Sequence, residues 1–371
     1  TNVVIDNNAF VKHESLNYYT TLTAIKDSFV DKLSINLYSV LTKYSQRELT
    51  DDDEVEIKYF CDIIPERADA AVEKYGCGKA VYDYHEILND PEIEAVSVCT
   101  PNAVHAPISI DFLKAGKNVL CEKPAARTYA EAKMMQEVQH ETGKTLNIGV
   151  VNRFNTAVNK IRERIRAGEL GEVYHVYVSF RAHRSIPGLG GAFTTKEIAG
   201  GGALIDWGVH YLDIVMYCTG DPKPVTVSGQ AFCKLGVDMP NYVYTNMWSE
   251  ITKDLNGTYD VDDSVTGFIR TEGGPTITLN GAWAQNIGVS ETYIDFLGDK
   301  AGIRLSYGGN FTIWGTEDGK LTRVCEDRAI ALADLKIELE HIDGPIYLVG
   351  DGAALAHKNL SAEIPELILP P

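Results

Sequence analysis

Short apolar runs alternate with amphipathic stretches from residue 54 to about residue 150. The apolar runs occupy residues 55–63, 94–101, 118–124 and 145–151. Strands that are buried on both faces of a parallel sheet form continuous apolar runs, and the helices that cover such a sheet are amphipathic. The alternation therefore predicts a parallel sheet whose strands are joined by right-handed crossover helices.

The pattern changes after about Arg153. Helix-like spacing is found at residues 156–168 and 209–220, and the other segments are long and β-rich. The β-rich segments occupy residues 172–184, 265–273, 276–285 and 291–298. We therefore predict an α/β domain followed by an α+β domain with a mainly antiparallel sheet. We expect these domains to occupy residues 1–150 and 151–330, with a C-terminal segment at 331–371.

The two ends of the chain are less regular. Between residues 15 and 45, apolar side chains recur every three or four positions, which predicts a long amphipathic packing helix. These side chains are Leu16, Tyr19, Leu22, Ile25, Phe29, Leu33, Leu37 and Leu41. After Asp327 the chain is rich in Leu, Ile and Ala without a clear period, so no element is predicted there.

The composition is that of an ordinary globular protein, since 44% of the 371 residues are hydrophobic and 23% are charged. The formal net charge of -18 argues against nucleic acids and anionic membrane surfaces as partners, because like charges repel and no Lys/Arg cluster offsets them. No apolar stretch is long enough to span a membrane, and the amino terminus lacks the features of a secretory signal. We therefore expect a cytoplasmic protein.

The cysteines are scattered, and no two of them form a C-x-x-C pair. They are Cys61, Cys77, Cys99, Cys121, Cys218, Cys233 and Cys325. This distribution indicates neither a disulfide framework nor a zinc site, and we predict no metal cofactor. Free thiols fit a reducing compartment.

Asp62 stands at the carboxyl end of a predicted strand and directly before a predicted helix. In a nucleotide-binding sheet, an acid at this place accepts hydrogen bonds from the adenosine ribose and repels a 2'-phosphate, which favours NAD over NADP. The alternative is that Asp62 merely caps the next helix, which begins near Pro65.

Polar residues also follow the next two predicted strands. They are Thr100, Asn102 and His105 after one strand, and Glu122 and Lys123 after the next. Ligands of open parallel sheets lie over the carboxyl ends of the strands. We therefore expect Lys123 to reach the position of a nicotinamide and Glu122 to contact a ribose or an amide. The alternative is a surface turn stiffened by Pro124.

The segment 200–213 begins with three glycines and carries Asp206, His210 and Asp213. On a helix, Asp206 and His210 are four positions apart and share one face, so both can reach a single substrate hydroxyl. A histidine accepts a proton near neutral pH, and a neighbouring carboxylate tunes its basicity. The alternative for this pair is a hydrogen bond inside an interior helix. Asp213 is either a cap partner or a surface acid.

Together these segments resemble a known family. The strings CDIIPERA, CTPNAVHA, CEKPA, NRFN and GGGALIDWGVHYLD, in this order, are similar to those of the glucose-fructose oxidoreductase, inositol dehydrogenase and rhizopine-catabolism oxidoreductase family. The resemblance covers roughly residues 54–315. It implies a Rossmann-like dinucleotide-binding domain, an open-faced and mainly antiparallel substrate domain, and a homo-oligomer that assembles through the sheet surfaces.

The resemblance also implies roles for individual residues. Lys123 would orient the substrate hydroxyl and the cofactor, Asp206 would help to position the substrate, and His210 would be the acid or base. The residues implied to line the cofactor are Thr100, Asn102, His105 and Glu122. Arg153 would border the substrate.

Residues 181–202 are most similar to oxidoreductases that oxidise the 3-hydroxyl of glucosides before the sugar is removed. The implied reaction is hydride transfer between NAD and a secondary hydroxyl of a sugar, a glycoside or a cyclitol. Two alternatives stay open. One is a non-catalytic sugar-binding or scaffold protein that has lost tight cofactor binding, and the other is a glycosidase that uses NAD transiently.

The amino terminus departs from the pattern of a dinucleotide-binding domain. Such domains open with a strand and a glycine-rich turn, because only glycine lets the backbone approach the pyrophosphate closely. Here Asp6 and Asn8 take the places of the glycines, whereas Gly350 and Gly352 follow a strand-like stretch at 346–349. Three interpretations are open: a degenerate turn near the start, a rearranged chain whose first strand is 346–349, or poorly assigned terminal residues. We favour the second, in which the two glycines contact the cofactor.

Overall fold

The computed structural model describes residues 21–26, 56–245, 247, 251–306, 309–317, 320–327, 346–347, 353–362, 364–365 and 367–368. Contacts between residues divide the chain into two compact units, Thr1–Val324 and Cys325–Pro371. Within the described part of the chain, every helix is too short or too polar to cross a membrane.

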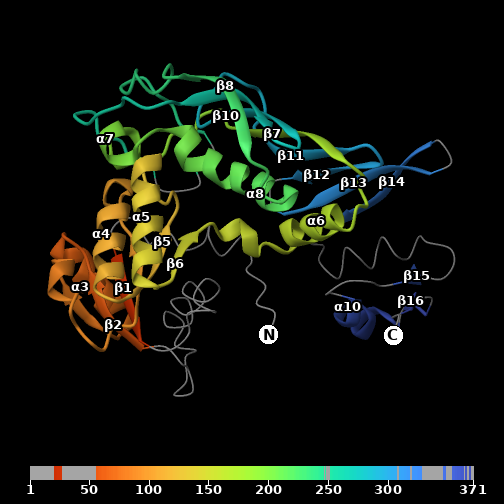
Figure 1. Cartoon of the computed structure of the whole chain (residues 1–371). Helices are drawn as coiled ribbons and strands as arrows, with labels where there is room; N and C mark the ends of the chain where they lie inside the picture. Colours follow the sequence, from red (N-terminus) through yellow and green to blue (C-terminus); the bar gives the residue numbers. More distant parts are fainter. Residues whose placement is uncertain are drawn as a thin grey trace. The chain divides into compact units, whose positions relative to one another are not determined.

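The first unit opens with a six-stranded sheet (Figure 1). Its strands are β1 (Thr21–Lys26), β2 (Glu56–Cys61), β3 (Lys79–Val81), β4 (Ala95–Cys99), β5 (Asn118–Glu122) and β6 (Leu146–Gly149). The strand order is β3-β2-β1-β4-β5-β6, and all strands except β1 run in the same direction. The parallel, Rossmann-like sheet predicted from the apolar runs is therefore confirmed.

Three α-helices connect these strands. They are α3 (Pro65–Tyr75), α4 (Asn102–Lys114) and α5 (Tyr129–Thr142), and a short 3-10 helix, η1 (Tyr84–Glu86), follows β3. Helix α4 packs on β4, β5 and α5, with Phe112 and Leu113 fully buried. Helix α5 begins at a capping box, in which Thr128 and Glu131 satisfy each other's main-chain N–H groups. The carboxyl ends of β2, β4 and β5 are thereby held at one edge of the sheet.

Strand β1 contradicts the long helix predicted between residues 15 and 45. The six residues Thr21–Lys26 form a strand between β2 and β4, and the rest of the predicted helix lies outside the described residues. Leu22 and Ile25 are spaced for a helix, but pairing with two strands satisfies the backbone of this short segment instead.

The direction of β1 bears on the phosphate-binding turn. Thr21 pairs with Cys99, at the carboxyl end of β4, so β1 begins where its parallel neighbours end. A turn after β1 would lie at the opposite edge of the sheet from Asp62 and Lys123. Strand β1 also occupies the place that the rearranged chain would give to residues 346–349, so the described strands do not support that interpretation.

An eight-stranded sheet follows along the chain. Its strands are β7 (Val173–Arg181), β8 (Pro224–Phe232), β9 (Ser264–Thr271), β10 (Thr276–Ala282), β11 (Glu291–Gly298), β12 (Ala301–Ser306), β13 (Phe311–Glu317) and β14 (Lys320–Asp327). The order is β14-β13-β12-β11-β7-β10-β9-β8. Only β7 and β10 are paired in parallel among the pairs described, which confirms the mainly antiparallel sheet.

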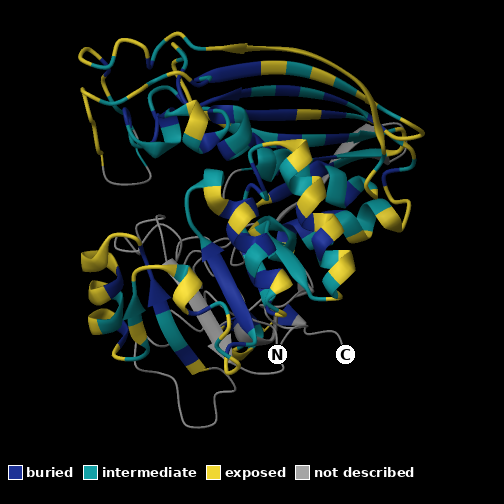
Figure 2. Ribbon diagram, turned by 60° about the vertical axis from the view of Figure 1, so that its left-hand side comes forward, coloured by how far each residue is buried: buried dark blue, intermediate teal, exposed yellow. Residues whose placement is uncertain are grey.

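Two helices, α6 (Thr156–Arg166) and α8 (Val209–Thr219), cover one face of this sheet. Their apolar side chains pack against Val176, Val178 and Phe180 of β7, all of which are buried. On the opposite face, Tyr177 of β7 and Phe268 of β9 are exposed. Every residue of the edge strand β8 is exposed as well (Figure 2). The sheet is therefore open on one side.

The second unit contains α10 (Ala353–Leu360) and a two-stranded parallel sheet. Strand β15 (Ile346–Tyr347) pairs there with β16 (Leu367–Ile368). Gly350 and Gly352, which we predicted to contact the cofactor, lie outside the described residues, and their role stays a prediction.

Candidate active site

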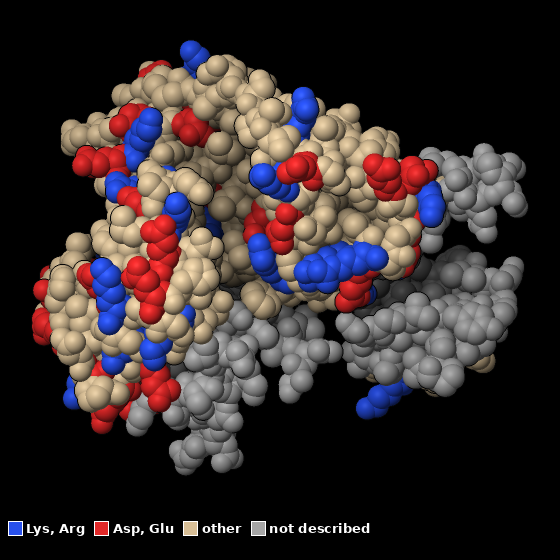
Figure 3. Space-filling model, viewed as in Figure 1, with Lys and Arg blue, Asp and Glu red and all other residues tan. Residues whose placement is uncertain are grey.

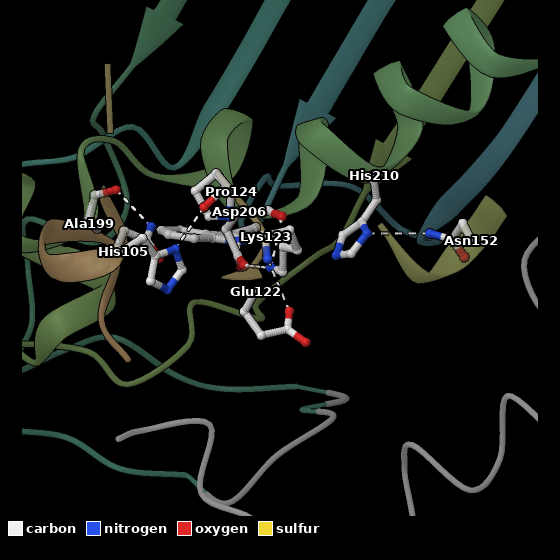
Figure 4. A network of polar contacts seen from close by, with 10 residues as sticks. His105, Glu122, Lys123, Pro124, Asn152, Ala199, Asp206 and His210 are labelled. Atoms are coloured by element: carbon white, nitrogen blue, oxygen red, sulfur yellow. Dashed lines mark hydrogen bonds and ion pairs between the residues drawn. The ribbon is translucent and has the colours of Figure 1, made fainter. Parts of the chain in front are cut away.

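Lys123 and Asp206 form an ion pair between the two sheet-containing parts of the first unit (Figure 4). Lys123 follows β5, and Asp206 belongs to a π-helical segment, η4 (Leu204–Gly208), that runs into α8. The Nζ atom of Lys123 lies 2.7 Å from Oδ1 of Asp206 and 3.2 Å from its main-chain oxygen. The structure thus brings together two of the three residues to which the sequence gives the chemistry.

A cap on the first turn holds η4 in place. The main-chain N–H groups of Gly202 and Leu204 donate to the carboxylate of Asp262, at 2.8 and 3.0 Å. A side chain at Gly202 would meet the main-chain oxygen of Asp262 at 1.9 Å, so only glycine fits there. The glycines before Asp206 therefore serve to start the helix at this point, close against the loop that precedes β9.

His210 lies one turn after Asp206, at the start of α8. Its Nδ1 atom is 3.4 Å from the amide nitrogen of Asn152, and its Nε2 atom is turned toward Lys123 (Figure 4). Burial and then the positive charge of Lys123 lower the pKa of His210 to about 3, although Asp206 acts in the opposite direction. The imidazole is therefore neutral at physiological pH and able to accept a proton.

Glu122 lies beside the ion pair and faces β6. Its Oε2 atom accepts the main-chain N–H of Lys123 at 3.1 Å. A side chain added at Gly149, the last residue of β6, would come within 3.1 Å of the Glu122 carboxylate, so this glycine leaves room for it. Burial raises the pKa of Glu122, while Lys123 acts against that shift. The carboxylate lies at the strand end where the sequence predicts a ribose or amide contact.

Asp62 is buried in the turn between β2 and α3. Its Oδ1 atom accepts the main-chain N–H of Ile64 at 2.9 Å, just before α3, as expected for a residue that shapes the helix start. Its Oδ2 atom is buried without a hydrogen-bond partner among the described residues. Burial raises the pKa of Asp62. An unpaired carboxylate oxygen at the end of β2 fits a donor such as a ribose hydroxyl.

His105 does not lie where direct contact with a cofactor requires it. The side chain is only 1% exposed, and its two ring nitrogens each lie 2.7 Å from a main-chain oxygen, that of Pro124 for Nδ1 and that of Thr100 for Nε2. It therefore links the loop after β4 to the loop that carries Lys123. The predicted contact between His105 and the cofactor is not supported by this geometry.

Thr100 and Asn102 occupy the turn between β4 and α4. The hydroxyl oxygen of Thr100 is buried without a hydrogen-bond partner among the described residues. The side-chain amide of Asn102 donates to the main-chain oxygen of Ala199, at 2.8 Å, at the end of α7 (Lys196–Ala199). Asn102 thus joins the two sheet-containing parts, and contact of either residue with a cofactor stays a prediction.

Arg153, in the 3-10 helix η2 (Val151–Phe154), is paired with Asp213. Its Nε and Nη2 atoms donate to the carboxylate at distances from 2.6 to 3.1 Å. Both residues line a groove of about 670 Å³ whose apolar wall includes Val209 and Leu212. On the face of the molecule seen in Figure 3, acidic and basic side chains are interspersed. The guanidinium of Arg153 is paired with Asp213. Its predicted role beside a substrate stays a prediction.

The sequence interpretation missed three residues of the site. Asn152 precedes Arg153 in the N-R-F string, Asp262 lies in the loop before β9, and Trp283 follows β10. The indole N–H of Trp283 donates to Oδ2 of Asp206 at 3.1 Å. Only the first of these lies in a motif that the resemblance contains.

Comparison with known proteins agrees with this arrangement. Residues 39–150 match a family model described as "Oxidoreductase family, NAD-binding Rossmann fold", and residues 158–304 match the "GFO/IDH/MocA C-terminal domain". The fold and the matched models define an NAD-binding oxidoreductase.

A relative of known name covers most of the chain. The D-glucoside 3-dehydrogenase of Escherichia coli (strain K12) is 32% identical over 305 residues, which are 81% of this chain and 84% of the relative. Inositol 2-dehydrogenase of Salmonella typhimurium is 35% identical over 125 residues, or 33% of this chain and 37% of that protein. The chain belongs to the GFO/IDH/MocA family.

Solved structures share the fold. A levoglucosan dehydrogenase in complex with NADH and levoglucosan has a TM-score of 0.63 at 23% identity, covering 73% of this chain and 70% of that one. An oxidoreductase domain protein from Kribbella flavida has a TM-score of 0.62 at 25% identity, covering 72% and 71%. The predicted succession of a Rossmann-like sheet and a mainly antiparallel sheet is thus found in known structures.

Proposed function

We propose that this chain oxidises a secondary hydroxyl of a glucoside or a related sugar, with NAD as the hydride acceptor. The main observation behind the proposal is the ion pair between Lys123 and Asp206, which lies one helical turn from a neutral His210. The similarity to the D-glucoside 3-dehydrogenase supports the 3-hydroxyl of a glucoside as the reacting group.

The described residues suit this reaction. Bound NAD supplies the acceptor for the hydride that leaves the carbon. His210 takes the hydroxyl proton at Nε2, the ring nitrogen turned away from Asn152. For this, the Asn152 side chain must present its amide oxygen to an N–H on Nδ1, because a neutral ring that accepts an N–H at Nδ1 already carries its own proton on Nε2. Lys123 donates a hydrogen bond to the same oxygen and stabilises the negative charge that builds up there. The products are a ketone, reduced cofactor and a proton on His210.

Asp62 and Glu122 would hold two ends of the cofactor. The unpaired Oδ2 of Asp62 fits a ribose hydroxyl at the end of β2, and Glu122 lies at the end of β5 beside Lys123. For the pyrophosphate between them, the described residues provide no glycine-rich turn, since β1 begins at this edge.

The two alternatives from the sequence are not favoured. A scaffold protein would not need a neutral histidine and a lysine held one turn apart at the edge where a cofactor binds. A glycosidase that uses NAD transiently differs from the 32% identical relative, whose name is that of a dehydrogenase.

Incubation of the protein with NAD and a panel of glucosides, free sugars and cyclitols tests the proposal. We expect reduced cofactor to accumulate with at least one glucoside, without release of the aglycone. Aglycone release without net cofactor reduction would indicate the glycosidase. Reduction by a cyclitol alone would contradict the proposed substrate class.

Asp62 provides a prediction on cofactor choice. Because its carboxylate would repel a 2'-phosphate, we expect Asp62→Ser to raise the ratio of kcat/KM for NADP to that for NAD by about tenfold or more, or about 1.4 kcal/mol. Initial rates with each cofactor measure this ratio. Asp69→Ser, which changes an exposed acid on α3, should leave the ratio as it is. An unchanged ratio in Asp62→Ser would remove Asp62 from the cofactor site.

We also propose that copies of this chain associate through the open face of the eight-stranded sheet. Phe268, Thr278 and Tyr177 are neighbours in register on β9, β10 and β7, so they share one face. Phe268 is 40% exposed and Tyr177 is 45% exposed, on the side away from the buried Val176 and Val178. Exposed aromatic side chains on a broad sheet support a homo-oligomeric contact.

This contact predicts the effect of a charge on the open face. We expect the wild-type protein to be at least dimeric by light scattering after gel filtration, and Phe268→Asp to dissociate it, because an unpaired carboxylate would be buried in the interface. Val289→Asp, in an exposed loop between β10 and β11, is the matched control and should stay associated. A monomeric wild-type protein would contradict the proposal.

Two further proposals concern location and domain boundaries. We propose a cytoplasmic location, supported by the absence of disulfides among the six described cysteines, and cell fractionation tests it.

We propose a domain boundary near residue 150, supported by the end of β6 at Gly149 and by the family models at 39–150 and 158–304. Limited proteolysis between β6 and α6 tests this boundary.

A further inference from the structure

The ammonium group of Lys123 has one N–H left for a substrate. A lysine side chain carries three N–H donors. Within the described contacts, two of them are directed at Asp206, one at Oδ1 (2.7 Å) and one at the main-chain oxygen (3.2 Å). The position of Asp206 therefore decides where the third donor points.

Both carboxylate oxygens of Asp206 accept a hydrogen bond. Lys123 occupies Oδ1, and the indole N–H of Trp283 donates to Oδ2 at 3.1 Å. Asp206 is 6% exposed and Trp283 is fully buried. The carboxylate is thus held on two sides and is enclosed by protein, so it acts on the substrate oxygen through Lys123 and not by direct contact.

The indole ring is itself fixed by the sheet domain. The main-chain N–H of Trp283 donates to the oxygen of Asp263 at 2.9 Å. The ring belongs to a buried cluster with Ile186, Leu189 and Ala203. Trp283 therefore offers its N–H from a rigid position.

We propose that Trp283 is a positioning residue for the reaction: its indole N–H orients the Asp206 carboxylate, which aims the remaining N–H of Lys123 at the substrate oxygen. The proposal rests on the proposed function, because Lys123 must act on a substrate. Without the indole N–H, the carboxylate can rotate and carry the ammonium with it. Displacements of this kind reduce turnover more than they reduce binding.

A double-mutant cycle tests the coupling. Trp283→Phe removes the N–H but keeps an aromatic ring, and we expect kcat to fall about tenfold with little change in the KM for NAD. In an Asp206→Ala background, Trp283→Phe should lower kcat by less than about threefold, because the carboxylate that accepts the indole N–H is already absent. An equal loss of kcat in both backgrounds would show that the indole acts independently of Asp206 and would overturn the proposal.

Trp207→Phe is the matched control. Trp207 packs against the same cluster and against the sheet core, whereas the indole that donates to Asp206 is that of Trp283. Its replacement should lower the melting temperature as Trp283→Phe does while leaving kcat within about twofold of wild type. A tenfold loss of kcat in this control would attribute both effects to packing.

A measurement on the indole itself does not depend on activity. The ¹⁵N–¹H resonance of the Trp283 indole is assigned by its disappearance in Trp283→Phe, and it should move upfield in Asp206→Ala. An unmoved resonance would show that the hydrogen bond is absent and would overturn the proposal. A protein that shows this shift but reduces no cofactor would contradict the proposed function instead.

Discussion

Lys123→Met lowers kcat by about 10²- to 10³-fold if the ammonium group stabilises charge on the substrate oxygen. This is the largest effect we expect, because the group would act most strongly when the oxygen carries negative charge. Methionine keeps the length of the side chain while removing the charge and all three donors. Steady-state rates with NAD and a reactive glucoside measure the loss.

A lower kcat in Lys123→Met can also result from unfolding, so its folding is measured as well. Asp206 is left buried without its cation, which destabilises the protein. Circular dichroism and thermal unfolding therefore accompany the rates. Lys133→Met, in an exposed i,i+4 pair with Glu137 on α5, is the control and should keep full activity. A folded Lys123→Met protein with unchanged kcat would place the chemistry elsewhere.

His210→Gln lowers kcat by about 10²- to 10⁴-fold if the imidazole is the general base. In the wild-type protein, burial and Lys123 lower the pKa of His210 to about 3, so the base stays neutral down to mildly acidic pH. We therefore expect no fall in kcat/KM for oxidation as the pH is lowered from about 8 to about 5. A fall centred near pH 6.5, the value of a free histidine, would show that His210 is not shielded in this way.

The same shift predicts a pH dependence of folding stability. His210 is protonated near pH 6.5 in the unfolded chain but only near pH 3 in the folded chain. Between these values the unfolded chain binds one proton more, so the free energy of unfolding is highest above pH 6.5 and falls as the pH is lowered toward 3. Between pH 7 and pH 5, we expect His210→Gln to lose about 1 to 2 kcal/mol less free energy of unfolding than wild type. Denaturant unfolding at both pH values measures it.

Two other histidines contribute to the wild-type pH dependence in the same direction. Burial lowers the pKa values of His105 and His175 as well, so part of the decline should remain in His210→Gln. His140→Gln, on the exposed surface of α5, should leave the decline unchanged. Identical declines in His210→Gln and wild type would contradict the shielded base.

The sequence predicts most of the fold because local patterns and tertiary structure agree there. The apolar run of β4 fits a strand buried on both faces, and the strict spacing of Ala157, Val158 and Ile161 fits a helix with one buried face. Strand β1 shows the limit. Its six residues satisfy a helical spacing equally well, and only pairing with β2 and β4, far along the chain, decides between the two.

The site is predicted less completely than the fold. Motifs identify Lys123, Asp206 and His210, since these residues lie in strings that the family shares. The partner of Asp206 in the sheet, Trp283, is 77 residues away and belongs to no such string. His105 lies in one of these strings, but the sequence alone does not show that its ring turns inward to two main-chain oxygens.

Transfer of a labelled hydride tests the central claim most directly. The protein is given NAD and a glucoside that carries deuterium on carbon 3, and the reduced cofactor is analysed by mass spectrometry. We expect the deuterium on the nicotinamide ring and a 3-keto glucoside in equal amount. Reduced cofactor without deuterium would place the reaction at another carbon. If no sugar substrate yields reduced cofactor, the chain is not a sugar dehydrogenase.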